Sequence, residues 1–322
     1  MQARPGSLRQ INAALLQARH AHDMTQFFDQ IMDRAAQGVP LPTAVVHPVD
    51  RRSLGGALAA AEAGLIAPIL VGPRAKIEAV GLDVGTHRVV DVPHSHAAAA
   101  RAVQLVHEGE AGALMKGALH TDEMLAEVIA RDSGIRTERR ISHVFVMRTP
   151  AYAKPLLITD AAINVMPDLL AKRDIVQNAI DIARAIGIET PKVAILSATE
   201  EVNPRLPSTI DAAALCKMAD REQISGGMLD GPLAFDIAVS PEAVEAKNLK
   251  SGVAGVADIL VVPDLVAGNM LAKQLDYLGG ADAFGIALGA QVPIILTSRA
   301  DGVEEREISA ALAKLVAERA RP

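Results

Sequence analysis

Residues 192–218 read KVAILSATEEVNPRLPSTIDAAALCKM. The first five, Lys192–Leu196, have the apolar, β-branched character of a buried strand, and residues 208–218 have a helical pattern after a polar turn. Strands that alternate with helices in this way are typical of a parallel sheet covered by helices on both faces. This stretch therefore predicts an α/β fold.

The same alternation continues along the chain. It predicts nine strands, at residues 43–47, 67–71, 87–92, 112–116, 143–147, 155–159, 192–196, 258–262 and 292–296. Helical patterns lie between them, at residues 95–107, 174–186, 208–218 and 267–278 among others. Because 322 residues exceed what one ordinary core holds, we expect two doubly wound parallel-sheet domains with an interdomain cleft.

A polar stretch with two prolines, residues 148–155, is the best candidate for a domain boundary, and a second lies near Ser298. The final segment places Ile308, Leu312 and Leu315 on one face of a helix, which we expect to return to the first domain. The expected domains are a first one of residues 1–147 and 297–322 and a second one of residues 148–296.

Composition excludes several classes of function. The formal net charge is −6, and the chain has five Phe, two Tyr and no Trp. A nucleic-acid partner would need clustered Lys and Arg or stacking aromatic side chains, so we expect none. The most apolar stretch, residues 54–72, contains Glu62 and Pro68, so we expect no membrane partner. No signal peptide is visible, and the single cysteine, Cys216, fits a reducing cytoplasm.

Four predicted strands end in unusually polar turns. In open α/β sheets, ligands bind outside the carboxyl ends of the strands, so these turns are the expected walls of one site. The helices that follow them would add backbone N–H groups and a positive dipole end for an anion. One of the four turns follows residue 196. The other three supply the candidate site residues, which are Lys116, His120 and Thr121, then Asp264 and Asn269, and then Ser298, Arg299 and Asp301.

Each turn also has a purely structural interpretation. Asp301 and Glu304 have the spacing of a capping box, and Thr121 could cap the helix after it. Asp264 and Asn269 could be turn and cap residues. The Ser-Arg pair is the hardest to explain in this way, because Arg is seldom buried without a partner.

Common cofactor and nucleophile motifs are missing from the sequence. It has no G-x-G-x-x-G after a first strand, no G-x-x-x-x-G-K-[ST] and no G-x-S-x-G. Cys216 lies in a helical, Ala/Leu-rich stretch typical of a buried, inert thiol. His94 and His96 have the only close histidine spacing, and on a helix they would point in different directions. We therefore predict no resident cofactor and no metal.

At these same turns the sequence resembles the phosphate acetyltransferase and phosphate butyryltransferase family. The resemblance runs in order from about Val45 to Ala317. The stretches that carry it include LMKGALHTDEML, IRTERRISHVFVM, PLLITDAAINVMPDLLAKRDIVQNAI, ADILVVPDLVAGNMLAKQLDYLGG and VPIILTSRAD.

The resemblance implies reversible transfer of a short acyl group, acetyl or butyryl, between coenzyme A and inorganic phosphate. It implies direct transfer in a ternary complex, the two-lobed fold of isocitrate and isopropylmalate dehydrogenases, and a homodimer. By the same resemblance, Ser298 stabilises the tetrahedral transition state and Arg299 holds the phosphate. The base that takes the thiol proton is Asp301, or alternatively Glu305. Many relatives carry an Arg in the helix after residue 121 that this chain lacks, and Arg136, Arg139 or Arg140 could replace it.

Two other functions stay open at this point. One is a fold-related dehydrogenase, which is disfavoured because no dinucleotide motif or metal-carboxylate cluster is evident. The other is a coenzyme A-binding homologue without activity. Acyl chain length cannot be read from these motifs.

Overall fold

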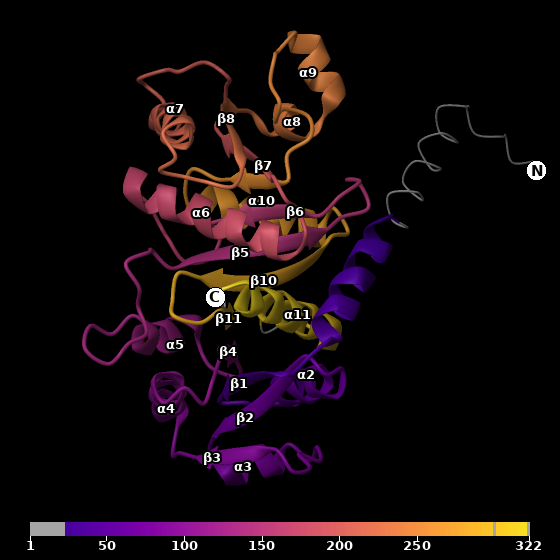
Figure 1. Ribbon diagram of the computed structural model, residues 1–322, viewed down its shortest axis with the longest axis vertical. Coiled ribbons are helices and arrows are strands. Elements are labelled where there is room, and N and C mark those ends of the chain that lie inside the picture. Colours follow the sequence, from indigo (N-terminus) through magenta and orange to yellow (C-terminus); the bar gives the residue numbers. More distant parts are fainter. Residues whose placement is uncertain (1–22, 299–300, 321–322) are drawn as a thin grey trace, which may run out of the picture.

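A single mixed sheet of eleven strands runs along the whole molecule (Figure 1). The structure is a computed structural model that describes residues 23–298 and 301–320. The strand order is β3-β2-β1-β4-β11-β10-β5-β6-β9-β7-β8. The strands are β1 (Leu41–Val46), β2 (Ile66–Gly72), β3 (Arg88–Asp91), β4 (Ala113–Lys116), β5 (Ser142–Arg148), β6 (Leu156–Thr159), β7 (Lys192–Leu196), β8 (Met228–Leu233), β9 (Ile259–Val261), β10 (Asp282–Leu288) and β11 (Ile294–Ile295).

Ten numbered helices connect these strands. They are α2 (Arg51–Glu62), α3 (Arg74–Ala79), α4 (Ser95–His107), α5 (Thr121–Val128), α6 (Leu169–Ala185), α7 (Pro207–Asp220), α8 (Phe235–Val239), α9 (Pro241–Lys247), α10 (Leu265–Tyr277) and α11 (Val303–Arg319). Residues 23–36 are also helical.

All nine predicted strands are present, and the sequence reasoning missed two more. One missed strand, β8, contains Gly231-Pro232. A proline has no backbone N–H to donate within a sheet, so its presence argues against a strand. In β10 the apolar run DAFGIAL follows two glycines and has Gly285 at its centre, which weakens the strand pattern. The α/β class is therefore confirmed, with two strands that glycine and proline concealed.

The direction of the strands reverses in the middle of the sheet. Strands β3, β2, β1, β4 and β11 pair in parallel in the first half, and β6, β9, β7 and β8 do so in the second. Between the halves, β11, β10, β5 and β6 pair antiparallel. The predicted parallel pairing holds within each half and fails at their junction. As a result, the two sets of parallel strands point in opposite directions along the sheet.

Helices cover both faces of the sheet in separate hydrophobic clusters. One face is covered by α2, α11, α6 and α7 in a single core that spans both halves. On the other face, α4 and α5 pack on the first half, and α8 and α10 pack on the second. In Figure 1, α6 lies in front of the sheet and α10 behind it.

The C-terminal helix is amphipathic, as its periodicity predicts, and it packs against elements of both halves. Ile308, Leu312 and Leu315 are buried, and α11 packs against α2, β10 and α6. Lys314 is also buried on this helix, where its ammonium donates to the carbonyl of Gln37 at 2.9 Å. The two domain boundaries stay a prediction, because the halves share one sheet and one of its cores.

Candidate active site

The carboxyl ends of β4 and β11 lie side by side. Ile294 pairs with Leu114 and Ile295 with Met115 in parallel register, so the two chains leave the sheet together. The ammonium of Lys116, which is only 3% exposed, lies 3.5 Å from the carbonyl oxygen of Thr297. Two of the predicted turns are therefore joined at this point, as the rule for open α/β sheets leads one to expect.

A buried arginine from α11 links these two strand ends. The guanidinium of Arg306 donates to the carbonyl of Lys116 at 3.4 Å and to the carbonyl of Ser298 at 3.2 Å. Its side chain passes over α2 at Gly56, where a Cβ atom would overlap the Cδ of Arg306. A glycine at position 56 is thus required for the guanidinium to reach both carbonyls.

Three charged groups around this arginine influence one another. Burial lowers the pKa of Arg306, and the charges of Asp301 and Asp50 oppose that shift. For Asp50, burial raises the pKa, but hydrogen bonds from Ser53 and Arg52 and the charge of Arg306 lower it overall. The site therefore holds a buried cation between two carboxylates.

Asp301 has a half-buried carboxyl group that contacts the turn after β11. Its Oδ2 accepts the backbone N–H of Ser298 at 2.6 Å. Burial raises its pKa, and the Ser298 N–H and the charge of Arg306 only partly offset this effect. A carboxylate whose pKa is raised is a stronger base than an ordinary aspartate.

The capping interpretation of Asp301 and Glu304 is wrong. The helix begins at Val303, and Glu305, not Glu304, accepts the backbone N–H of the residue before it, Gly302, at 2.8 Å. Glu304 instead pairs with Arg148 at 2.8 Å. Glu305 therefore binds the start of the helix, whereas Asp301 contacts the turn after β11.

His120 and Thr121 follow the end of β4, and His120 lines a cavity of about 440 Å³. Thr121 is the first residue of α5, and His120 is in the capping position, so the helix starts one residue earlier than predicted. The cavity is lined by Asp50, Ser95, Ala118, Leu119, His120 and Glu123. Helices α2, α4 and α5 all begin at this cavity, which places their positive dipole ends near it.

Asp264 and Asn269 lie on the other half of the molecule. Asp264 caps α10 by accepting the N–H of Ala267 at 2.9 Å, and the Asn269 amide donates to the carbonyl of Ala161 at 3.3 Å. Because the strands of this half run in the opposite direction, the turn at Asp264 lies away from Ser298. The far end of α10 comes closer, since the charge of Lys273 lowers the pKa of Asp301. A substrate contact for either residue stays a prediction.

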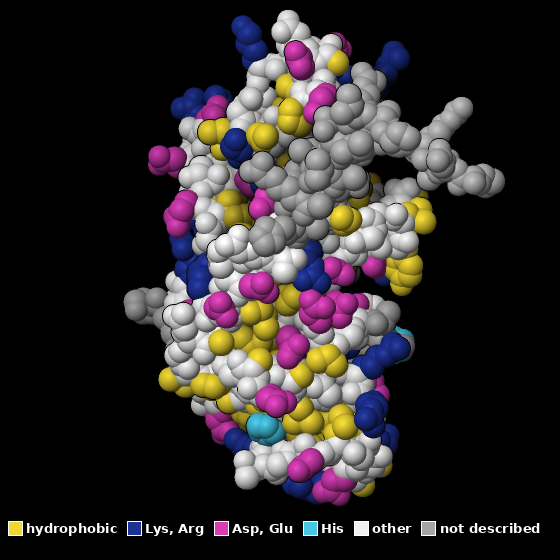
Figure 2. Space-filling view, turned by 90° about the vertical axis from the view of Figure 1, so that its right-hand side faces the viewer, with side chains coloured by type: hydrophobic (Ala, Val, Ile, Leu, Met, Phe, Trp, Pro, Cys, Tyr) yellow, Lys and Arg dark blue, Asp and Glu magenta, His cyan; other side chains and the backbone are white. Residues whose placement is uncertain are grey.

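Arg299, the expected phosphate clamp, lies outside the described residues. Seen from the side, the surface has a notch between the two halves, and Asp and Glu side chains gather beside it (Figure 2). An anionic substrate near this acidic surface would need a local cation, a role that the resemblance gives to Arg299.

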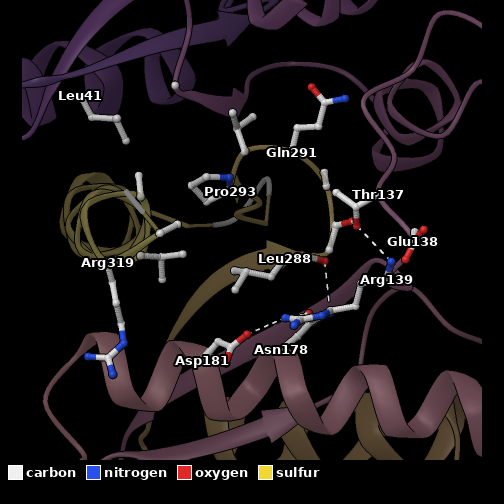
Figure 3. Close-up of a pocket in the computed structure, with 17 residues that line it drawn as sticks. Leu41, Thr137, Glu138, Arg139, Asn178, Asp181, Leu288, Gln291, Pro293 and Arg319 are labelled. Atoms are coloured by element: carbon white, nitrogen blue, oxygen red, sulfur yellow. Dashed lines mark hydrogen bonds and ion pairs between the residues drawn. The ribbon is translucent and has the colours of Figure 1, made fainter. Parts of the chain in front are cut away.

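Another cavity, of about 830 Å³, lies elsewhere (Figure 3). It touches Leu41 and Gly112, at the amino-terminal ends of β1 and β4, and therefore lies opposite Lys116 and Ser298. In Figure 3, Arg139 reaches across its wall to Asp181. Ligands in open α/β sheets bind at the carboxyl ends of strands, so this cavity is not the candidate active site.

Arg306, Gly56 and Lys273 were not singled out from the sequence. The available signal was an arginine on the apolar face of the last helix, since Arg306 shares a face with Ala310 and Ala313. Nothing in the pattern around Gly56 or Lys273 distinguished them from ordinary helical residues.

Other classes of site are not evident in the described part of the chain. Within residues 23–298 and 301–320, no helix is both long and apolar enough to cross a membrane. No group of three or more His, Cys, Asp or Glu side chains in these ranges could hold a metal ion.

The buried arginine gives a prediction about stability. Replacing Arg306 with Met should lower the free energy of unfolding by about 3–5 kcal/mol, because Asp301 and Asp50 lose their buried partner and two carbonyls lose a donor. Urea denaturation followed by circular dichroism measures this quantity. Lys217→Met is the matched control, because its pair with Asp220 is exposed and should contribute little. Equal midpoints for the two variants would contradict the structural role of Arg306.

Comparison with known proteins agrees with this geometry. Over residues 86–314 the chain matches the family described as "Phosphate acetyl/butaryl transferase". It is 60% identical over 298 residues to the phosphate acetyltransferase of Rhizobium meliloti, covering 91% of this chain and 94% of that protein. It is 41% identical to the phosphate butyryltransferase of Clostridium acetobutylicum, covering 91% and 99% of the two chains.

A solved structure has a similar fold. The branched-chain phosphotransacylase from Enterococcus faecalis V583 superposes with a TM-score of 0.74 at 31% sequence identity. The match covers 86% of this chain and 99% of the other.

Proposed function

The chain belongs to the phosphate acetyl/butyryltransferase family, and from this premise we infer that it moves an acyl group reversibly between the sulfur of coenzyme A and inorganic phosphate. The observation that supports assigning this function to particular residues is that the carboxyl ends of β4 and β11 lie side by side. There the half-buried carboxyl of Asp301 holds the backbone of Ser298 beside buried Lys116.

In the direction of acyl-CoA synthesis, we propose that Asp301 is the base that takes the proton from the thiol of coenzyme A. A thiol has a pKa of about 8.5, so a positioned carboxylate helps to form the thiolate at neutral pH. The thiolate then attacks the carbonyl carbon of the acyl phosphate. A carbon–sulfur bond forms, the carbon–oxygen bond to phosphate breaks, and phosphate leaves. The hydroxyl of Ser298 donates to the oxyanion of the tetrahedral intermediate.

In the other direction, a phosphate oxygen attacks the thioester carbon and the thiolate leaves, taking back the proton from Asp301. Arg299 holds the phosphate, because the planar fork of a guanidinium matches two phosphate oxygens. Lys116 ends the neighbouring strand and adds positive charge, and the ring of His120, four residues further on, offers a hydrogen-bonding group. Neither direction needs a covalent acyl-enzyme, so coenzyme A and phosphate are substrates and no resident cofactor is invoked.

The only cysteine supports this direct route. Cys216 lies on α7, and burial raises the pKa of its thiol to about 12, with the charges of Asp230 and Asp220 adding to the shift. A thiol with so high a pKa is almost entirely protonated at neutral pH and is a poor nucleophile. Cys216 has no second cysteine to pair with, which supports the proposal of a cytoplasmic location.

The acyl group is proposed to be short, acetyl or butyryl. The experiment that tests the function is a thiol-release assay with phosphate and a series of acyl-CoA substrates from acetyl to hexanoyl. Phosphate-dependent release of coenzyme A is expected for the shorter members. No release with any acyl-CoA would favour a homologue without activity, and reduction of a nicotinamide cofactor would favour a dehydrogenase.

We also propose a homodimer. Four apolar side chains near the starts of α6 and α10 are 61–87% exposed, and the two segments adjoin, because Leu265 donates its N–H to the carbonyl of Val165 at 3.1 Å. Such a patch is unusual on a monomer. Its residues are Val165, Met166, Val266 and Met270.

Sedimentation velocity at micromolar concentration should therefore give a dimer. Met166→Glu combined with Met270→Glu should shift it toward the monomer, since like charges would meet across a symmetric interface. Met228→Glu, at a separate exposed methionine, is the control. A wild-type monomer would disprove the dimer.

A further inference from the structure

Three successive carbonyls at the turn after β11 each accept a hydrogen bond from the side chain of a different element. The donors are His143 of β5 for Leu296 at 3.3 Å, Lys116 of β4 for Thr297 at 3.5 Å, and Arg306 of α11 for Ser298 at 3.2 Å. Side chains, rather than a ladder of backbone bonds, therefore hold the stretch of chain that carries Ser298. Of the three donors, His143 lies deepest, because its side chain is fully buried within the sheet.

The ring of His143 offers a single donor, and that donor faces Leu296. Burial lowers the pKa of His143, and the charge of Asp160 and the hydrogen bond to Leu296 only partly oppose this effect, so the ring is neutral at neutral pH. A neutral imidazole has one N–H, and a carbonyl can only accept, so the proton is on Nε2. The other ring nitrogen, Nδ1, is buried and has no hydrogen-bond partner among the described residues.

The position of the ring is fixed by packing. Phe145 is two residues further along β5, and its ring meets that of His143 edge-on, with the centroids 4.4 Å apart. Residues two apart on a strand point to the same face, so the two rings lie on one side of the sheet. This packing leaves the imidazole directed over β10 toward β11, which is the next strand but one in the sheet.

Gly285 on β10 provides the space for this contact. A Cβ atom at position 285 would overlap the carbonyl oxygen of Leu296 and would lie 2.8 Å from the Nε2 of His143. Leu296 is also bound to Gly285 directly, since its backbone N–H donates to the carbonyl of Gly285 at 3.2 Å. A glycine at this position is therefore required for the ring to reach Leu296 across the intervening strand.

The contact lies at the point where the chain leaves the sheet. Strand β11 ends at Ile295, so Leu296 is the first residue beyond it and Ser298 is two residues further on. Without the imidazole, the buried carbonyl of Leu296 would lack this donor, and buried polar groups seldom stay unpaired. A rotation of the peptide after Leu296 would move the hydroxyl of Ser298. A displacement of about 1 Å at a reacting group can lower a rate by about 100-fold.

We propose that His143 is a positioning residue for acyl transfer, whose Nε2–H fixes the backbone at Leu296 and thereby the place of the Ser298 hydroxyl. The inference rests on the proposed function, because it is there that the Ser298 hydroxyl donates to the oxyanion. His143 touches no substrate and carries no proton in the reaction. It acts only through Ser298.

The first test replaces the ring. His143→Leu, which keeps a side chain of similar size but removes the donor, should lower kcat by about 10- to 100-fold with little change in KM. His143→Gln should recover most of kcat, because its amide N–H can reach nearly the same point as Nε2. Thr159→Val is the matched control, since it removes the hydroxyl that donates to the carbonyl of His143 at 2.8 Å and leaves the ring in place. Its kcat should equal that of the wild type.

The deciding measurement combines His143→Leu with Ser298→Ala. If His143 acts through the Ser298 hydroxyl, the double variant should have the kcat of Ser298→Ala alone, within about 2-fold. Losses that multiply would mean that His143 contributes only to the general packing of the sheet. If His143→Leu does not fold by circular dichroism, Gly285→Ala replaces it in the same comparison, because the added Cβ displaces the same carbonyl.

Nitrogen-15 NMR of the histidine rings tests the contact without any substrate. The ring signal that disappears in His143→Gln should be that of a neutral imidazole protonated at Nε2. A proton on Nδ1, an unchanged kcat in His143→Leu, an equal loss in Thr159→Val, or losses that multiply in the double variant would each overturn the inference while the wild type stays active. An inactive wild type would instead overturn the proposed function, and the role of His143 with it.

Discussion

Replacing Asp301 with Asn is expected to lower turnover of acyl transfer by roughly 100- to 10,000-fold, the usual effect of losing a general base. The reason for choosing Asn is geometric. The Asn side-chain oxygen can still accept the Ser298 N–H that Asp301 accepts at 2.6 Å, but it cannot take a proton from a thiol. Steady-state kinetics with coenzyme A and acetyl phosphate measure this loss.

The pH profile gives an independent measurement for the same variant. A base must be ionised to act, and burial raises the pKa of Asp301, so the acidic limb of kcat/KM in the wild type should lie above the ordinary aspartate range. The Asn variant should lack this limb. Glu305→Gln is the control, because Gln can still accept the Gly302 N–H, so its profile should match the wild type. A normal limb in Asp301→Asn and its loss in Glu305→Gln would exchange the two assignments.

Asp301→Asn should not lower the stability of the fold, although it lowers activity. A carboxyl whose pKa is raised in the folded state binds its proton more tightly there than in the unfolded chain. Its favourable contribution is therefore present below the unfolded pKa and is lost as the pH rises through the folded pKa. At neutral pH the ionised Asp301 costs stability, so Asp301→Asn should unfold at the same temperature as the wild type or a higher one. A clearly lower unfolding temperature would indicate that Asp301 is structural.

The sequence predicted local elements well because their causes are local. Strand and helix patterns depend on side-chain periodicity within a few residues, and the nine predicted strands are present for that reason. The antiparallel pairing of β10 and β5 depends on contacts between residues about 140 positions apart, such as Ala287 and His143, which no local pattern records. The sheet reversal was therefore not predicted.

For the candidate site too, the local features could be predicted from the sequence and the long-range contacts could not. Lys116 and Ser298 follow strands, so the rule that ligands bind at strand ends identified both turns before the structure joined them. The role of Arg306 depends on α11 crossing both turns and on the space above Gly56, which only the tertiary packing supplies. Asp264 is the opposite case: its role as a cap follows from the local pattern, but no local pattern records that its half of the sheet runs the other way.

Replacing Ser298 with Ala is the cleanest test of transition-state stabilisation at this site. Three hydrogen bonds of Ser298 use its main chain: its N–H donates to the Asp301 side chain, and its carbonyl accepts from Arg306 and from the backbone N–H of Asp301. Ala keeps both groups, and the Ser298 side chain is exposed, so the substitution removes the hydroxyl with little effect on the fold. Turnover should fall by roughly 100- to 1000-fold with a modest change in KM, as expected on losing one oxyanion donor.

Thr297→Val supplies the matched control for this variant. The hydroxyl of Thr297 is one residue away, is buried at 2% exposure and has no hydrogen-bond partner among the described residues. Removing an unpaired buried hydroxyl in favour of an isosteric methyl group should leave turnover unchanged and stability equal or slightly higher. The pair of variants separates a hydroxyl that acts on the oxyanion from one that merely fills space. If Ser298→Ala turned over as fast as Thr297→Val, the oxyanion would have to be stabilised by another donor, and Lys116, which ends the neighbouring strand, would be the next residue to replace.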